Sequence, residues 1–210
     1  MKVFDLTHVT HNDMPVYAEP NRPDIKKVAI IEENGYQETL ISVFSHNGTH
    51  MDSPRHMYTK GETLDKLDIE NFVGKAYVLE LEKGNKNIEL EYLKKYEDEI
   101  KRSDFIIFKS GWSKFWGKKQ YYVGYPTLTE EAANYIADTN IKGIGIDMLS
   151  VDRYDTSVFK VHHILFEKGK IIIENLTNLE NVPEKFLFIA APFKYNDADG
   201  APVRAIAIVE

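Results

Sequence analysis

The segment SHNGTHMDSPRHM, residues 45–57, constrains this chain more than any other part of its sequence. It contains three of the seven histidines, His46, His50 and His56, together with Asp52. Imidazole nitrogens and carboxylate oxygens are the ligands that zinc and similar divalent ions prefer in proteins. The close spacing of these side chains therefore indicates a metal site.

The residues between these groups favour a bent strand over a helix. A helix would point Asp52 away from the face that His46 and His50 share. On a strand, His50 and Asp52 lie on one face because side chains alternate. A bend at Asn47-Gly48 would fold His46 back toward that face, since this residue pair favours turns and bulges. We therefore expect a bend, an extended run up to Asp52, and a second break at Ser53-Pro54.

This segment resembles the HxGTHxDxPxH signature of the cyclase family of metal-dependent hydrolases, which includes bacterial kynurenine formamidase and isatin hydrolase. Further parts of the chain resemble other family segments, namely FDLTHVTHNDMPVY, FKSGWSKFW, GIGIDMLSVD, VHHILFEKGKIIIENLTNL and APFKYNDADGAPVRAIAI. The resemblance implies an α/β fold with a mixed β-sheet of the swivelling β/β/α type. We expect one domain that spans residues 1–210.

The resemblance implies two further metal ligands in the later segment, where family members carry a histidine and a glutamate twelve residues apart. In this chain, that spacing selects His162 and Glu174. The adjacent His163 is the competing ligand, and we expect it to pack or to support the site from outside. Glu174 ends an apolar run, where an unpaired carboxylate would be costly, so a metal or a basic partner must compensate it.

We expect one or two divalent ions per chain. The predicted ligands are His46, His50, Asp52, His162 and Glu174, with Asp52 able to bridge two ions. The resemblance implies zinc in kynurenine formamidases and manganese in isatin hydrolases, and we expect zinc, with manganese as the alternative. We predict that His56 transfers protons and does not bind metal, because histidine titrates near neutral pH.

The expected reaction is hydrolysis of a small amide C–N bond. N-formylkynurenine, which would give kynurenine and formate, is the best single substrate; the residues that bind the substrate are not assigned. A cyclic amide such as isatin, or another small acyl compound, is the alternative within this class. A metal-binding module without catalysis is the alternative from another class.

Composition and charge exclude other classes of function. The net charge of −7 argues against nucleic acid as a partner, because nucleic acid requires a basic surface. There is no run of eighteen apolar residues and no apolar stretch of the kind found in signal peptides, so we expect no membrane partner and a cytoplasmic protein. The chain has no cysteine, so no thiol can bind metal or attack a substrate.

An aromatic segment, residues 110–126, is the other chemical feature of the sequence. Its three glycines predict a loop. Such a loop suits an aromatic ligand or a subunit interface, and we favour the interface. Together with the resemblance, it predicts a homodimer or homotetramer in which this loop or the N-terminal segment reaches a neighbouring active site. We expect His8 and His11 at solvent or at an interface.

The hydrophobic pattern predicts an α/β domain with a mixed sheet. Strands are expected at residues 2–6, 26–32, 37–45, 75–82, 105–109, 142–147, 171–174, 186–190 and 203–209, and helices at about 88–100, 129–139 and 154–167. Thr129 is expected to cap the second helix. The apolar face of the third helix is expected at Val158, Val161 and Leu165.

Polar residues after the strand at 142–147 have two possible roles. Asp147, Ser150 and Asp152 are expected to cap the next helix, and a role for Asp147 in the site is the less favoured alternative. The tripeptide Gly200-Ala201-Pro202 is expected to make a turn before the final strand.

Overall fold

A closed barrel is the centre of the computed structural model, which describes residues 1–209. In that range, seven strands follow one another in the order β12, β11, β5, β7, β9, β10 and β4, and β4 pairs again with β12. They are β4 (His50–Asp52), β5 (Val73–Glu80), β7 (Phe105–Lys109), β9 (Gly143–Ile146), β10 (Ile171–Glu174), β11 (Lys185–Pro192) and β12 (Gly200–Val209). β1 (Lys2–Asp5) extends the sheet beside β12.

Parallel and antiparallel pairs are both present in the barrel. Strands β5, β7, β9 and β10 pair in parallel, whereas β4, β11 and β12 pair with their neighbours in antiparallel orientation. The predicted α/β fold with a mixed sheet is therefore confirmed.

The apolar run FIIFK of β7 shows why these strands are buried on both faces. Phe105 and Ile107 belong to the core inside the barrel, and Ile106 and Phe108 pack in the core on its helix side. Side chains alternate along a strand, so a strand covered on both faces has a continuous apolar sequence.

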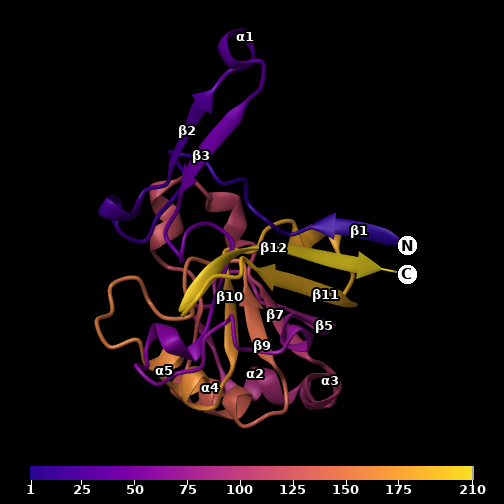
Figure 1. Cartoon of the computed structure of the whole chain (residues 1–210). Coiled ribbons are helices and arrows are strands. Elements are labelled where there is room, and N and C mark those ends of the chain that lie inside the picture. Colours follow the sequence, from indigo (N-terminus) through magenta and orange to yellow (C-terminus); the bar gives the residue numbers. More distant parts are fainter. Residues whose placement is uncertain (210) are drawn as a thin grey trace.

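Four helices cover one side of the barrel (Figure 1). They are α2 (Leu90–Lys94), α3 (Glu97–Arg102), α4 (Glu130–Ala137) and α5 (Lys160–Glu167). The predicted cap of α4 is confirmed, because the Thr129 side chain accepts the backbone N–H of Ala132. None of the helices formed by residues 1–209 is long and apolar enough to cross a membrane.

Two helix predictions were wrong in extent. The single helix expected at 88–100 is two short helices, because Tyr96 has non-helical backbone angles (φ −116°, ψ 19°). The helix expected at 154–167 begins only at Lys160, because Phe159 adopts the left-handed conformation with φ 50°. Val158 therefore lies outside the helix and is exposed, so it does not join Val161 in the buried face.

A two-stranded ribbon projects from the barrel (Figure 1). It consists of β2 (Asp24–Ala29), the one-turn helix α1 (Ile31–Asn34) and β3 (Glu38–Ser42), and we call residues 24–42 the arm. The strand expected at 26–32 was wrong at its end, because α1 begins there and stops at Gly35 in the left-handed conformation. A short parallel pair that the sequence did not suggest joins β6 (Asn87–Ile88) to β8 (Thr127–Leu128).

One further expectation was wrong. The turn predicted at Gly200-Ala201-Pro202 is instead the start of β12, where Pro202 pairs with His50 of β4. The aromatic segment 110–126 packs in large part into the core of its own chain, with Tyr121 completely buried. Short 3-10 helices complete the fold: η1 (Glu19–Asn21), η2 (Pro54–His56), η3 (Ile69–Phe72), η4 (Trp112–Phe115), η5 (Lys119–Tyr122) and η6 (Leu179–Asn181).

Candidate active site

The register of two paired strands places three of the predicted ligands on one face. β4 and β10 are antiparallel neighbours, with His50 opposite Glu174. Met51 belongs to the core inside the barrel, so His50 and Asp52 on either side of it face outward by strand alternation. Glu174 lies beside them on that outer face, with an oxygen 3.6 Å from His50 Nε2.

The predicted bend brings His46 to the same place. Gly48 has φ 66°, which turns the chain before the extended run of β4, so the expected bend is confirmed. His46 Nδ1 then lies 2.6 Å from Asp52 Oδ1. The ring also packs on Gly200, where a Cβ atom would lie 2.4 Å from His46 Cε1, so a side chain at position 200 would displace the imidazole.

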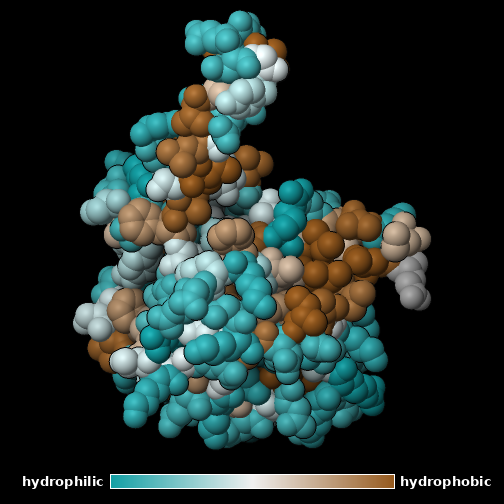
Figure 2. Space-filling model, in the orientation of Figure 1, coloured by the Kyte–Doolittle hydropathy of each residue, from teal (hydrophilic) through white to brown (hydrophobic). Residues whose placement is uncertain are grey.

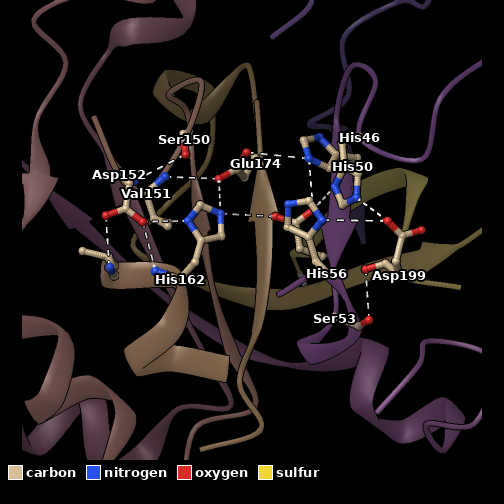
Figure 3. Close-up of polar contacts among 12 residues, drawn as sticks. His46, His50, Ser53, His56, Ser150, Val151, Asp152, His162, Glu174 and Asp199 are labelled. Atoms are coloured by element: carbon tan, nitrogen blue, oxygen red, sulfur yellow. Dashed lines mark hydrogen bonds and ion pairs between the residues drawn. The ribbon is translucent and has the colours of Figure 1, made fainter. Parts of the chain in front are cut away.

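Helix α5 supplies His162 from the opposite side of the group (Figure 3). His162 Nε2 lies 3.9 Å from Asp52 Oδ2 and 3.6 Å from Glu174 Oε1. Asp152 accepts the backbone N–H groups of Val161 and His162, and the same carboxylate contacts His162 Nδ1 at 2.7 Å. The predicted capping role of Asp152 is confirmed, and the cap also orients the imidazole.

In each of these three histidines, one ring nitrogen faces the carboxylates and the other has a partner outside the group. His50 Nδ1–H donates to the Gly48 carbonyl at 2.9 Å, which leaves Nε2 directed at Asp52. His162 Nδ1 is held by Asp152, and Nε2 faces inward. Such outer partners fix the ring orientation of metal-binding histidines.

The electrostatics of the cluster also suit a divalent cation. Asp52 and Glu174 are both buried, and their ion pairs within residues 1–209 involve only histidines. Burial, and then the charge of Asp52, raises the pKa of Glu174 well above its usual range. Burial alone would lower the pKa of His46, but Asp52 and Asp199 more than offset this effect and raise it to about 10. A cation would relieve the repulsion between the two buried carboxylates.

His56 and Asp199 flank the cluster on its more open side (Figure 3). His56 ends η2, beyond the predicted break at Ser53-Pro54, and its ring centroid lies 3.9 Å from that of His46. Asp199 Oδ2 lies 2.8 Å from His46 Nε2 and 3.8 Å from His56 Nδ1. Three sets of these residues have the spacing to hold an ion: His46 with His50 and Asp52; Asp52 with His162 and Glu174; and His46 with His56 and Asp199.

A cavity of about 370 Å³ is lined in part by the side chains of this cluster. Much of its wall is apolar and comes from the N-terminal segment, η2 and the chain near α5: Pro15, Val16, Tyr17, Met57, Leu149 and Phe159. The predicted cluster forms the polar part of the lining, with Asn21, Ser150 and Asn175. The aromatic segment 110–126 does not line this cavity, so it is not the expected cradle for an aromatic ligand here.

Comparisons with known proteins show the family of the chain. A model of the family described as putative cyclase matches residues 4–153. The chain belongs to the cyclase family. A kynurenine formamidase from Bacillus thuringiensis is 31% identical over 97% of this chain and 95% of its own length.

Two solved structures extend the comparison of this cyclase-family protein. A predicted metal-dependent hydrolase from Bacillus stearothermophilus is 33% identical, with a TM-score of 0.82 over 98% of this chain and 97% of that one. Isatin hydrolase A from Labrenzia aggregata is 26% identical, with a TM-score of 0.88 over 99% and 93%. These relatives are hydrolases, and the comparisons support a metal-dependent hydrolase of the cyclase family.

Other polar residues weighed from the sequence lie outside the cyclase-family site. His163 packs against Tyr58, with ring centroids 5.3 Å apart. Asp147 accepts hydrogen bonds from Ser110 and from the two following backbone N–H groups, so it fixes the start of the aromatic segment. His11 is exposed as expected, whereas His8 is half-buried and stacks on Trp116 at 4.0 Å.

The sequence reasoning missed Asp199 and Asn175. Asn175 Nδ2–H donates to the Gly48 carbonyl, and its Oδ1 accepts the Tyr121 hydroxyl. Asn175 therefore links the aromatic segment to the bend at Gly48. Asn175 directly follows Glu174 with φ 59°, a conformation that asparagine tolerates, but no spacing pattern marks it. Asp199 is one of two aspartates in NDADG, and only the pairing of β12 with β4 shows which one meets His46.

Proposed function

We propose that this protein hydrolyses a small aryl amide, with N-formylkynurenine as the best single substrate and kynurenine and formate as products. The observation that carries the proposal is the position of the His/Asp/Glu cluster in the cavity that the apolar wall encloses. A cavity of about 370 Å³ is of the size found for small-molecule sites. The apolar wall suits an aryl ring, and the cluster suits the polar amide.

The five predicted ligands divide into two sets in this proposal. His46, His50 and Asp52 would hold one ion, and Asp52, His162 and Glu174 would hold a second, with zinc favoured and manganese the alternative. Bound there, a divalent ion would acidify a water molecule and polarise the amide carbonyl. The protein itself keeps the ligands in place through the outer partners of the imidazoles.

His56 is the proposed proton-transfer residue. It lines the cavity and lies against His46, but its side chain remains 30% exposed, so it can meet both substrate and solvent. A histidine in this position can accept a proton from the attacking water and return it to the departing amine. No serine or cysteine nucleophile is required.

The first experiment is metal analysis of the purified protein, followed by turnover assays on N-formylkynurenine, isatin and simple lactams. We expect one or two zinc or manganese ions per chain and fastest turnover of the aryl formamide. Metal binding without turnover of any of these compounds would favour the non-catalytic metal-binding module. Absence of bound metal after reconstitution would contradict the proposal as a whole.

Isatin is the second candidate substrate. The observation in its favour is the structural similarity to isatin hydrolase A, with a TM-score of 0.88 over nearly the whole chain. Isatin presents a lactam carbonyl beside an aromatic ring, so the same polar cluster and apolar wall would serve it. Faster turnover of isatin than of the formamide would decide for this alternative.

We further propose that the protein is a homodimer or a dimer of dimers and that the arm contributes to the interface. Every residue of β3 is exposed, including Leu40 and Ile41, and the nearby Phe44 is 47% exposed. Figure 2 shows apolar surface along the base of the arm. An isolated two-stranded ribbon is marginally stable in water, so apolar side chains on both of its strands call for a second surface.

A second copy of the chain is the partner that the arm's position favours. β3 ends at Ser42, and His46 follows four residues later, so the arm leads directly into the metal-site bend. An exchange of arms between two copies would be a closed, symmetric arrangement that supports both sites. The aromatic segment 110–126 is less suited to this role, because its Tyr121 and Tyr125 are buried in their own chain.

A further inference from the structure

Asp199 is the one carboxylate that contacts both His46 and His56 within residues 1–209 (Figure 3). It lies immediately before β12, whose first residue, Gly200, pairs with Asp52 of β4. The Ser53 backbone N–H donates to the Asp199 carbonyl at 3.0 Å, as does the Ser53 hydroxyl. The backbone of Asp199 is thus tied to the strand that carries two of the predicted ligands.

The side chain of Asp199 is also held in place. The Tyr195 hydroxyl lies 2.9 Å from Oδ1 and 2.6 Å from the Gly200 carbonyl, and the Ser45 hydroxyl lies 3.4 Å from Oδ2. That leaves Oδ2 directed at His46 Nε2, 2.8 Å away. A carboxylate held in this way needs little rearrangement to orient an imidazole.

The three imidazoles of the cluster follow one pattern, and Asp199 completes it. The outer nitrogen of His50 meets the Gly48 carbonyl, and the outer nitrogen of His162 meets Asp152. The outer nitrogen of His46 meets Asp199, while its inner nitrogen faces Asp52. Asp152 and Asp199 stand at opposite ends of the cluster in Figure 3, Asp152 beside His162 and Asp199 beside His46 and His56.

We propose that Asp199 is a positioning residue: it directs His46 Nδ1 toward the metal and keeps His56 beside the cluster. This inference rests on the metal site of the proposed function, but not on the substrate. Asp199 acts through the two imidazoles and does not itself bind the ion. The alternative is that Asp199 is a ligand in the set with His46 and His56, which would take His46 Nε2 away from its outer partner.

The experiment measures the affinity of the metal-free protein for Zn²⁺ by competition with a chromophoric chelator. The variants are Asp199→Ala and Asp199→Asn, with Asp197→Asn as the matched control. Asp197 lies on the same loop, is 53% exposed and pairs with Arg55 away from the cluster. Loss of an outer partner weakens metal binding by about 10- to 100-fold, so we expect Asp199→Ala to lose affinity on that scale.

The pattern among the variants separates positioning from a structural role. Asn at 199 keeps an oxygen that can accept from His46 Nε2–H, so its loss of affinity should be smaller than that of Ala. Asp197→Asn should bind like the wild type, and the number of ions bound at saturation should not change in any variant. If Asp199→Ala does not fold, Asp199→Asn and Tyr195→Phe carry the test, and each should weaken binding severalfold.

Two outcomes would overturn the inference. Wild-type affinity in folded Asp199 variants would show that the carboxylate does not orient His46. A loss of one ion from the stoichiometry, with the others bound as tightly as before, would make Asp199 a ligand. A wild-type protein that binds Zn²⁺ but cleaves none of the amides would contradict the proposed function and leave the affinity comparison intact.

Discussion

The metal-site face of the barrel and the arm are both built on antiparallel strand pairs, yet their side chains lie in opposite environments. On the barrel face, the charged side chains Asp52 and Glu174 are 1% and 5% exposed. On the arm, the apolar side chains of Leu40 and Ile41 are 55% and 60% exposed. Each region reverses the usual distribution of polar and apolar residues.

Both reversals indicate a binding partner, but the two partners differ in chemistry. Buried carboxylates without a lysine or arginine call for a cation, because desolvated charges of like sign repel one another. Exposed apolar strands call for another protein surface. We therefore expect that each region can be disrupted without loss of the other's partner.

Asp52→Ala should have the largest effect, because Asp52 belongs to both predicted sets of metal ligands. We expect loss of bound metal by elemental analysis and loss of turnover to the background rate. Association of the chains should persist, since the arm is unchanged. Equal metal content in the wild type and in Asp52→Ala would contradict the interpretation that the buried carboxylates bind a cation.

His56→Asn should lower kcat by roughly 100- to 10,000-fold, the usual scale for a general acid–base group. The metal content should stay at the wild-type value, because His56 lies at the edge of the cluster and not between Asp52 and Glu174. Steady-state kinetics and elemental analysis of the same preparation provide both numbers. Loss of metal would make His56 a ligand, and unchanged turnover would remove it from the mechanism.

The sequence predicted the centre of the site better than its surroundings, for a physical reason. His46, His50 and Asp52 lie within seven residues, so local backbone rules for Asn47-Gly48 and for strand alternation were sufficient to bring them together. Asp199 is 153 residues from His46, and its place depends on the register of β12 against β4. No local pattern encodes that register.

The errors in secondary structure have the same origin. Strands of continuous apolar sequence, such as residues 105–109 and 171–174, were predicted with correct boundaries. The helix at 154–167 was placed too early, because Phe159 is left-handed and Asp152, which caps the following turn, lies outside the helix.

Substitution of Leu40 and Ile41 by aspartate should disrupt association and leave the barrel intact. Both side chains lie on the exposed β3, so the folded chain tolerates charge there, whereas an apolar interface does not. We expect sedimentation velocity to show monomer for this double variant and dimer or tetramer for the wild type, with equal metal content. The control replaces Glu38 and Thr39 of the same strand by aspartate. A monomeric wild type with full activity would contradict the interface.

The smallest effect is expected at His8, a half-buried side chain whose Nε2 lacks a hydrogen-bond partner within residues 1–209. Its ring stacks on Trp116. Burial lowers the pKa of His8 from 6.5 to about 4. Between these two values the unfolded chain takes up a proton that the folded chain does not. The contribution of His8 to stability is therefore complete above about pH 6.5 and falls as the pH drops toward 4.

His8→Phe keeps the stacked ring but cannot titrate, so its stability should depend less on pH. After allowance for the partly exposed ring, we expect the wild type to lose about 1 kcal/mol more unfolding free energy than this variant between pH 7 and pH 4.5. Urea unfolding of the metal-free proteins at both pH values measures the difference. His11→Gln is the matched control, because His11 is an exposed histidine of the same N-terminal segment. If wild type and His8→Phe lose the same unfolding free energy between the two pH values, His8 has a partner in solution, such as the second chain.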